Sequence, residues 1–141
     1  MKILLAHKKI DDFDLNFAIQ LALLHDILED TETEFLEIAE NFGEKVAIGV
    51  QALTKNKNLI SKNDRMMDSL NRINSLEKEV GIVKLADRIT NLQKPPKHWE
   101  KDKIQSYLAE AQLINEILNN KNVYLHHRLD TKIAEYKKYS D

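Results

Sequence analysis

The chain has 141 residues, of which 43% are hydrophobic and 31% are charged, and this composition suits one globular domain with one core. Its 21 basic and 23 acidic residues leave a formal net charge of −2, which favours neither nucleic acid nor an anionic membrane as a partner. The absence of cysteine excludes disulfides and thiolate metal sites within this chain. No apolar stretch approaches the ~20 residues of a membrane span and no secretion signal is recognisable, so we expect a cytoplasmic protein.

Apolar residues recur with the period of a helix along most of the chain, and no alternating strand pattern competes with them. The sequence therefore predicts an all-α fold, with a single domain over residues 1–141. In chain order, the expected helices cover about residues 1–8, 12–29, 35–42, 46–53, 63–77, 79–93, 100–119 and 123–139.

Several helix boundaries carry recognisable signals. Asp12 or Asp14 can cap the second helix. Thr31 and Glu34 have the spacing of a capping box before the third helix, and Gly43 suits its C-terminal end. We expect a polar loop at residues 55–62. We also expect Pro95-Pro96 to stop the helix predicted at about 79–93.

The end of the second helix is unusually polar for an apolar segment. His25 lies one turn before Glu29, and Asp26 one turn before Asp30, so each pair shares a helix face. The rest of this helix is apolar nearly all round, which predicts a buried, central helix. Carboxylates are disfavoured at the negative C-terminal end of a helix dipole, so their presence there indicates a bound cation.

A second polar stripe runs along the helix predicted at 79–93. Lys84, Asp87, Arg88 and Asn91 fall at positions i, i+3, i+4 and i+7 of an otherwise apolar helix. Lys84, Arg88 and Asn91 would supply positive charge and hydrogen bonds to a phosphate.

If the two stripes face each other, His25, Asp26 and Asp87 form a mixed nitrogen and oxygen ligand set. Such a set suits Mn, Fe, Zn or Mg without selecting one of them. Taken alone, a His-Asp dipeptide is more often structural, and a carboxylate beside an arginine is more often an ion pair. Two polar stripes on two buried helices favour a metal and phosphate site.

The remaining histidines are expected at the surface. These include His7 and His98, as well as His126 and His127, which lie in a polar helix with no carboxylate cluster. Trp99 is interpreted as a packing residue.

Segments 23–31 (LLHDILEDT) and 83–92 (VKLADRITNL) closely resemble the paired motifs of the HD-domain phosphohydrolases. More narrowly, they resemble the RelA/SpoT-type hydrolase domain that degrades the alarmone (p)ppGpp, including its small stand-alone forms. Further similarity lies in segments 35–47, 52–55 and 103–111, and the resemblance covers roughly residues 15–118. It implies an HD-domain-like helical bundle.

The resemblance also implies roles for individual residues. His25, Asp26 and Asp87 correspond to metal ligands, commonly of Mn²⁺ in this branch. Glu29 and Asp30 correspond to the acidic pair that handles the attacking water.

On the substrate side, Asn91 corresponds to a residue near the bound nucleotide. Tyr107 corresponds, by a weaker match, to a contact with the phosphate or ribose. The implied partner is a phosphorylated nucleotide, and the implied reaction is removal of the 3′-pyrophosphate from a guanosine nucleotide.

One feature departs from that family. Its members have another metal-binding histidine before the HD pair, and the matching position, 24 residues before His25, is Met1. His7 would point about 120° away from the expected direction. We therefore expect three of the four protein ligands and no preceding helices. Their absence would expose apolar faces of the helices at about 14–29 and 79–93 and would favour a homo-oligomer.

Three functions remain open from the sequence. The first is a metal-dependent pyrophosphohydrolase of the alarmone type. The second is an HD phosphohydrolase of another nucleotide or phosphate ester. The third is a catalytically degenerate helical module that binds or regulates a partner.

Overall fold

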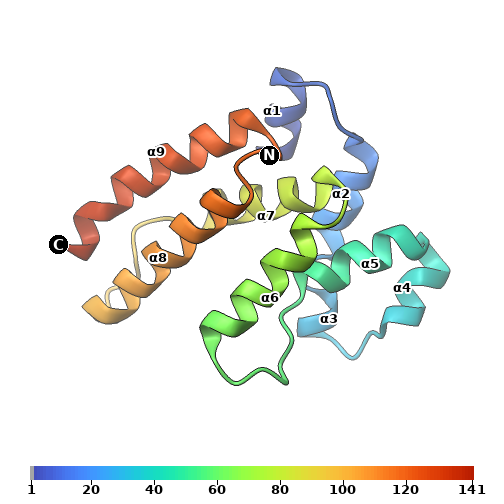
Figure 1. Ribbon diagram of the computed structural model, residues 1–141, viewed down its shortest axis with the longest axis horizontal. Coiled ribbons are helices and arrows are strands. Elements are labelled where there is room, and N and C mark those ends of the chain that lie inside the picture. The colour runs from blue at the N-terminus through green and yellow to red at the C-terminus, as the bar shows by residue number, and fades with distance from the viewer. Residues whose placement is uncertain (1) are drawn as a thin grey trace.

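The computed structural model describes residues 2–141 and contains no strand in that range, which confirms the all-α prediction (Figure 1). Nine helices occur in these residues. They are α1 (Lys2–Lys9), α2 (Leu15–Leu24), α3 (Ile27–Asp30), α4 (Phe35–Phe42), α5 (Glu44–Leu53), α6 (Lys62–Asn74), α7 (Lys78–Asn91), α8 (Lys101–Ile117) and α9 (Val123–Ser140).

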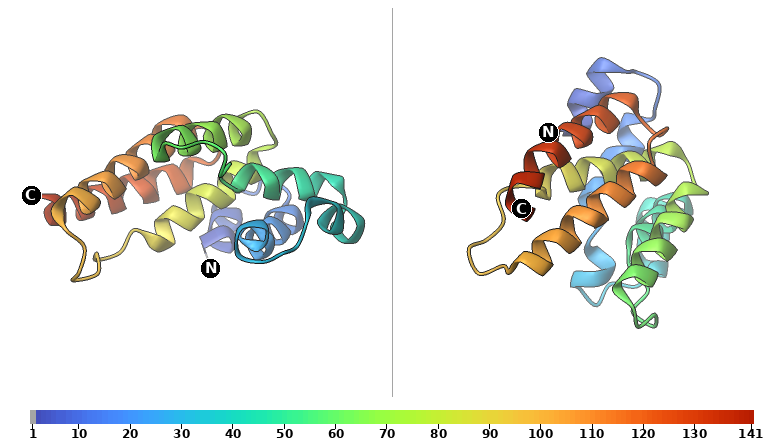
Figure 2. Two further views of the ribbon diagram at one scale, coloured as in Figure 1. Left: turned by 90° about the horizontal axis from the view of Figure 1, so that it is seen from below. Right: turned by 60° about the vertical axis from the view of Figure 1, so that its left-hand side comes forward.

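Helix α7 is the centre of the fold. It contacts α1 and α2 on one side and the α8–α9 pair on the other, and α5 and α6 also pack against it (Figure 2). Ten of its 14 residues are buried, including the charged Glu79, Lys84 and Arg88. The expectation that its apolar face would be exposed is wrong, because helices from both halves of the chain cover it. Two charged side chains of the predicted polar stripe are thereby held inside the protein.

The prediction of one continuous helix up to about Glu29 is wrong, because the helix is interrupted at two of the predicted site residues. Helix α2 ends at Leu24 and α3 begins at Ile27, so His25 and Asp26 lie at the break. The Nδ1 atom of His25 lies 2.6 Å from the carbonyl oxygen of Ala22. In a continuous helix that carbonyl would accept the backbone N–H of Asp26. The His25 side chain thus takes the position of a backbone donor.

Burial of α2 is also less complete than its composition predicts. Only Phe17, Ala18 and Leu21 of this helix are buried, and the side chain of Leu23 is 76% exposed. Helix α2 is therefore a peripheral helix that packs on α7 and α5, and not the central one.

The start of α2 is fixed by two carboxylates. The side chain of Asp14 accepts a hydrogen bond from the backbone N–H of Phe17 at 3.1 Å, so Asp14 and not Asp12 is the cap. The backbone N–H of Asp14 in turn donates to the buried Glu79 of α7 at 2.7 Å. This second bond fastens the start of α2 to the central helix.

The capping box of α4 lies three residues later than predicted. Glu34 is the N-cap and Glu37 its partner, whereas the hydroxyl of Thr31 donates to the carbonyl of Ile27 at 2.6 Å and closes the end of α3. Gly43 ends α4 as predicted, with a φ of +96° that favours glycine. No helix among residues 2–141 combines the length and hydrophobicity of a membrane span.

Candidate functional site

The two polar stripes meet where the α2–α3 break faces α7, as the sequence predicts. The Nε2 atom of His25 lies 3.1 Å from Oδ2 of Asp26 and 3.4 Å from Oδ1 of Asp87. The hydrogen bond with Asp87 raises the pKa of His25 to about 9, against the lowering effect of burial. His25 is therefore an imidazolium at neutral pH in the metal-free protein.

The two carboxylates differ in their environment. Burial works to raise the pKa of Asp87, but the hydrogen bond and charge of His25, together with the nearby cations, hold that pKa below its usual value. Burial raises the pKa of Asp26, and the charge of His25 offsets this only in part. Asn91 donates from Nδ2 to Oδ1 of Asp87 at 3.2 Å, so its amide orients this carboxylate.

The donor chemistry of these three residues fits a divalent metal ion. A metal would use the lone pair of the same ring nitrogen that now holds a proton between two carboxylates. In the described structure the three residues do not place one donor atom each within 4.8 Å of one another. In this arrangement His25 forms ion pairs with Asp26 and Asp87. Together the three side chains offer one imidazole nitrogen and two carboxylates.

A cavity of about 170 Å³ opens at this cluster. Six of the nine predicted site residues line it, namely His25, Asp26, Glu29, Lys84, Asp87 and Arg88. The other three, Asp30, Asn91 and Tyr107, do not line it. The remaining lining residues are Leu53, Lys55 and Val83.

Two buried cations form the basic wall of this cavity. Lys84 is 9% exposed and Arg88 is 7% exposed. Burial lowers the pKa of Lys84 to about 8, which still leaves it mainly charged at pH 7. The Nε and Nη1 atoms of Arg88 have no hydrogen-bond partner among the described residues. Buried donors without partners are rare, and planar guanidinium donors match phosphate oxygens.

Tyr107 holds Arg88 in place. The guanidinium carbon of Arg88 lies 4.3 Å from the centre of the Tyr107 ring, a cation–π distance. Trp99 and Tyr136 contact the same ring, with ring centres 5.4 Å and 6.1 Å away. The interpretation of Trp99 as a packing residue is thus consistent with its position. Tyr107 does not line the cavity itself, but its ring contacts Arg88, which does.

The two predicted acidic residues occupy unequal positions. Glu29 lines the cavity, and its Oε1 atom accepts the backbone N–H of Lys55 at 2.8 Å. Asp30 is exposed and lies outside the cavity lining. Of the pair, only Glu29 has a carboxylate in the same cavity as the histidine cluster.

Lys55 lines the candidate site, although its sequence position alone did not indicate this. It lines the cavity of the histidine cluster and also a neighbouring cavity of about 530 Å³. The rest of this larger cavity is lined by Leu28, Gln51, Thr54, Asn56, Lys57, Asp68 and Arg72. The sequence signal for Lys55 was the similarity of segment 52–55 to the hydrolase family described above. The position of Lys55 beside Glu29, however, depends on the tertiary fold.

The start of α1 borders the other side of the cluster. A cavity of about 140 Å³ there is lined by residues that include Lys2, Ile3, His25 and Asp87. Met1, the position that corresponds to the further histidine of the resembled family, lies outside the described residues. His7 instead pairs with Asp11 at 2.7 Å and lines neither cavity, so it does not replace that ligand.

An all-α fold with a His-Asp pair facing a second aspartate on a buried helix defines the class of the HD domains. The model of the HD domain family matches residues 1–92. The chain therefore belongs to the HD domain family.

Curated relatives are similar over most of the chain. The guanosine-3′,5′-bis(diphosphate) 3′-pyrophosphohydrolase MESH1 of Danio rerio is 33% identical over 83% of this chain and 67% of its own length. The protein of the same name from Xenopus tropicalis is 34% identical over 79% of this chain and 64% of its own length. The chain thus spans about two thirds of these relatives.

A solved structure of a metazoan ortholog of SpoT, described as hydrolysing ppGpp, has a TM-score of 0.78 to this chain. It covers 95% of this chain and 77% of its own, at 24% sequence identity. At that identity the likeness establishes the fold alone.

Proposed function

We propose that this chain is a metal-dependent phosphohydrolase that releases pyrophosphate from the 3′ position of guanosine 3′,5′-bis(diphosphate). One observation carries the proposal most strongly. A histidine with two facing carboxylates shares a cavity with two buried cations, of which Arg88 has two nitrogens without partners. The activity for which the similar proteins of Danio rerio and Xenopus tropicalis are named supports the choice of nucleotide.

We propose His25, Asp26 and Asp87 as the residues that would hold the metal. Mn²⁺ is the ion we expect, although the donor set also suits other divalent ions. When bound, a divalent ion supplies a more acidic water and neutralises phosphate charge.

Glu29 is the better placed of the two acidic residues to take a proton. Its Oε1 atom is fixed by the backbone of Lys55, so the second oxygen remains to accept a proton from water in the cavity. Asp30 stands at the exposed edge, and we propose for it an electrostatic role only.

Lys84 and Arg88 would bind the pyrophosphate that leaves. Arg88 offers two donors in the plane of its guanidinium, and Lys84 adds a point charge from the preceding turn. The adjacent cavity of about 530 Å³ has the size of a small-molecule site. Lys55 lines both this cavity and that of the histidine cluster. We propose that the larger cavity takes the nucleoside part of the substrate.

The test is pyrophosphate release from ppGpp in the presence of added Mn²⁺. We expect turnover by the unmodified chain and a loss of more than roughly 100-fold in Asp87→Ala, since outer-shell partners of metals alone account for 10–100-fold. Asp102→Ala, which removes an exposed carboxylate on α8, should leave the rate unchanged.

Two results would decide against the proposal. No pyrophosphate release together with no bound metal by elemental analysis would leave the degenerate module as the better reading. Turnover of another phosphorylated nucleotide in place of ppGpp would establish the broader HD phosphohydrolase instead. A cytoplasmic location stays a prediction.

A further inference from the structure

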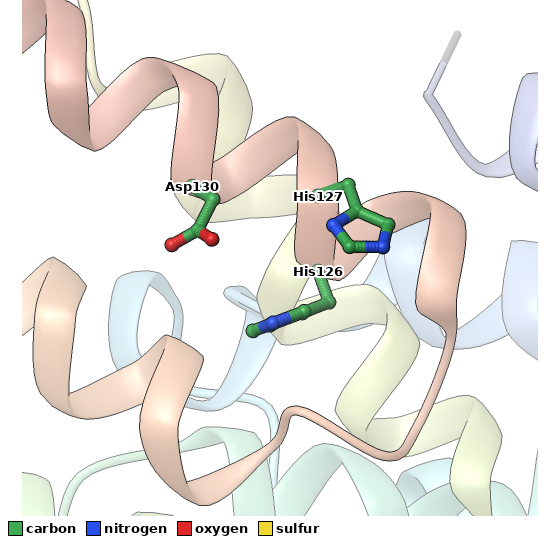
Figure 3. Close-up of side chains that lie close together, drawn as sticks. All are labelled: His126, His127 and Asp130. Carbon is green, nitrogen blue, oxygen red and sulfur yellow. The ribbon is translucent and has the colours of Figure 1, made fainter.

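The start of α9 brings together a second group of metal-ligating side chains. His126, His127 and Asp130 each offer one donor atom, and these atoms all lie within 4.8 Å of one another (Figure 3). On an α-helix, residue i+4 lies angularly between residues i and i+1 and one turn further along. The carboxylate of Asp130 therefore stands above both imidazoles, which is a three-point arrangement.

A buried amide of the neighbouring helix α8 orients two of these three groups. Asn115 is 4% exposed, and its Nδ2 donates to Oδ1 of Asp130 at 3.2 Å. Its Oδ1 lies 2.8 Å from Nδ1 of His126. Both hydrogen-bonding atoms of this amide are thus used on the cluster.

The chain of bonds also fixes which nitrogen of His126 is free. A carboxylate only accepts hydrogen bonds, so the Asn115 amide must turn its NH₂ group toward Asp130. Its oxygen then faces His126, whose Nδ1 must carry the proton. The lone pair of neutral His126 is consequently on Nε2. Metal-binding histidines are held in the same way, by a hydrogen bond from the other ring nitrogen.

This cluster is separate from the site proposed above. None of its members lines the cavity around His25, and all lie beyond residues 1–92, the part that the HD family model matches. His126 and His127 lie at the surface as expected, but the expectation that no carboxylate gathers with them is wrong. Asp130 lies one helical turn away, and the contribution of Asn115 depends on how α8 packs against α9.

We propose that His126, His127 and Asp130 bind a first-row divalent transition metal ion, with Asn115 as a positioning residue. Two imidazoles and one carboxylate suit Zn²⁺ and ions of similar preference better than the hard ions Mg²⁺ or Ca²⁺. His127 and Asp130 are exposed and His126 is half-buried, so an ion reaches them from solvent and keeps water in its remaining positions.

Zinc binding by the tag-free chain tests this proposal. After equilibrium dialysis against Zn²⁺ at constant pH, elemental analysis counts the bound ions per chain. We expect His127→Ala and Asp130→Asn to lose one bound equivalent, with an affinity at least roughly tenfold weaker. His98→Ala removes an exposed imidazole elsewhere and should bind as much zinc as the unmodified chain.

Variants of the first site keep the two proposals apart. His25→Asn combined with Asp87→Asn should remove only the one zinc ion bound at the His25 cluster, where the α2–α3 break faces α7. If that double variant removes all the zinc, the α9 site is refuted and the proposed function is untouched. If only His127→Ala and Asp130→Asn remove zinc, the α9 site stands and the proposed metal centre fails.

The role of Asn115 has its own readout. Imidazole ¹H–¹⁵N spectra should show a protonated Nδ1 on His126 in the metal-free chain and a shift of its Nε2 on adding Zn²⁺. Asn115→Leu should weaken zinc binding roughly 10–100-fold, as the loss of an orienting partner does at other metal sites. A protonated Nε2 on His126, or equal zinc loss in His98→Ala, would overturn the proposal.

Discussion

His25 holds a proton between two carboxylates in the metal-free chain, and this links stability to pH. Its pKa rises from 6.5 to about 9 on folding, chiefly through the hydrogen bond to Asp87. The imidazolium therefore stabilises the fold fully below about pH 6.5, and this contribution is lost as pH rises through 9. It is on the order of 2 kcal/mol, because the side chain is partly exposed.

The prediction is checked by thermal unfolding of chelator-treated protein from pH 6 to 9.5. Lys84 opposes His25 at the upper end, since its lowered pKa of about 8 adds stability as pH rises above that value. The informative quantity is thus the difference in unfolding free energy between the unmodified chain and His25→Asn. That difference should shrink across pH 6.5–9, and a constant difference would contradict the assigned proton.

We propose that Tyr107 acts in substrate binding by supporting Arg88, whose guanidinium lies over its ring. The guanidinium carbon lies 4.3 Å from the ring centre, a contact worth about 1 kcal/mol. We expect Tyr107→Leu to raise the KM for ppGpp roughly fivefold with a smaller change in kcat. Tyr107→Phe keeps the ring and should behave like the unmodified chain. If Tyr107→Phe is as impaired as Tyr107→Leu, the hydroxyl touches the substrate directly.

At the scale of elements, the sequence predicts most helices but not the break at His25. Segment 15–30 has a helical apolar pattern throughout, and nothing in that pattern marks an interruption. At the break the Nδ1 atom of His25 lies 2.6 Å from the Ala22 carbonyl oxygen, a contact that requires one particular side-chain orientation. A similar limit applies to the capping box, where Thr31 and Glu34 have suitable spacing but Glu34 and Glu37 form it.

The two candidate caps of α2 lead to a stability prediction. Asp14→Ala should destabilise the fold by about 1 kcal/mol, because the Phe17 N–H loses its acceptor. The bond from the Asp14 backbone to Glu79 survives that change, so the effect stays local. We expect a fall in Tm of about 3–5 °C by calorimetry.

Asp12→Ala is the matched control for this cap. The Asp12 carboxylate pairs with the exposed Lys78 at 3.4 Å, a surface ion pair of little energetic value. If Asp12→Ala and Asp14→Ala destabilise the fold equally, the cap at Asp14 makes no specific contribution to its stability.

At the scale of the whole molecule, the sequence predicts the meeting of α2 and α7 but not the surroundings of their site. Both stripes are polar interruptions of apolar helices, and burying them is favourable only when each pairs with the other. His25 and Asp87 thus form an ion pair although they lie 62 positions apart in the sequence. Lys55 and the stacking of Tyr107 on Arg88 come from loop and helix packing that no local pattern encodes.

Self-association is the remaining prediction at this scale. Exposed leucines lie on the adjacent helices α1 and α2, where Leu4 is 46%, Leu5 43% and Leu23 76% exposed. Exposed apolar side chains on neighbouring helices favour contact between copies. We expect light scattering to give a mass that grows with protein concentration. Leu23→Lys should lower that growth, whereas Leu36→Lys, at a 66% exposed leucine of α4, should not. A constant monomer mass in concentrated solution would refute the homo-oligomer.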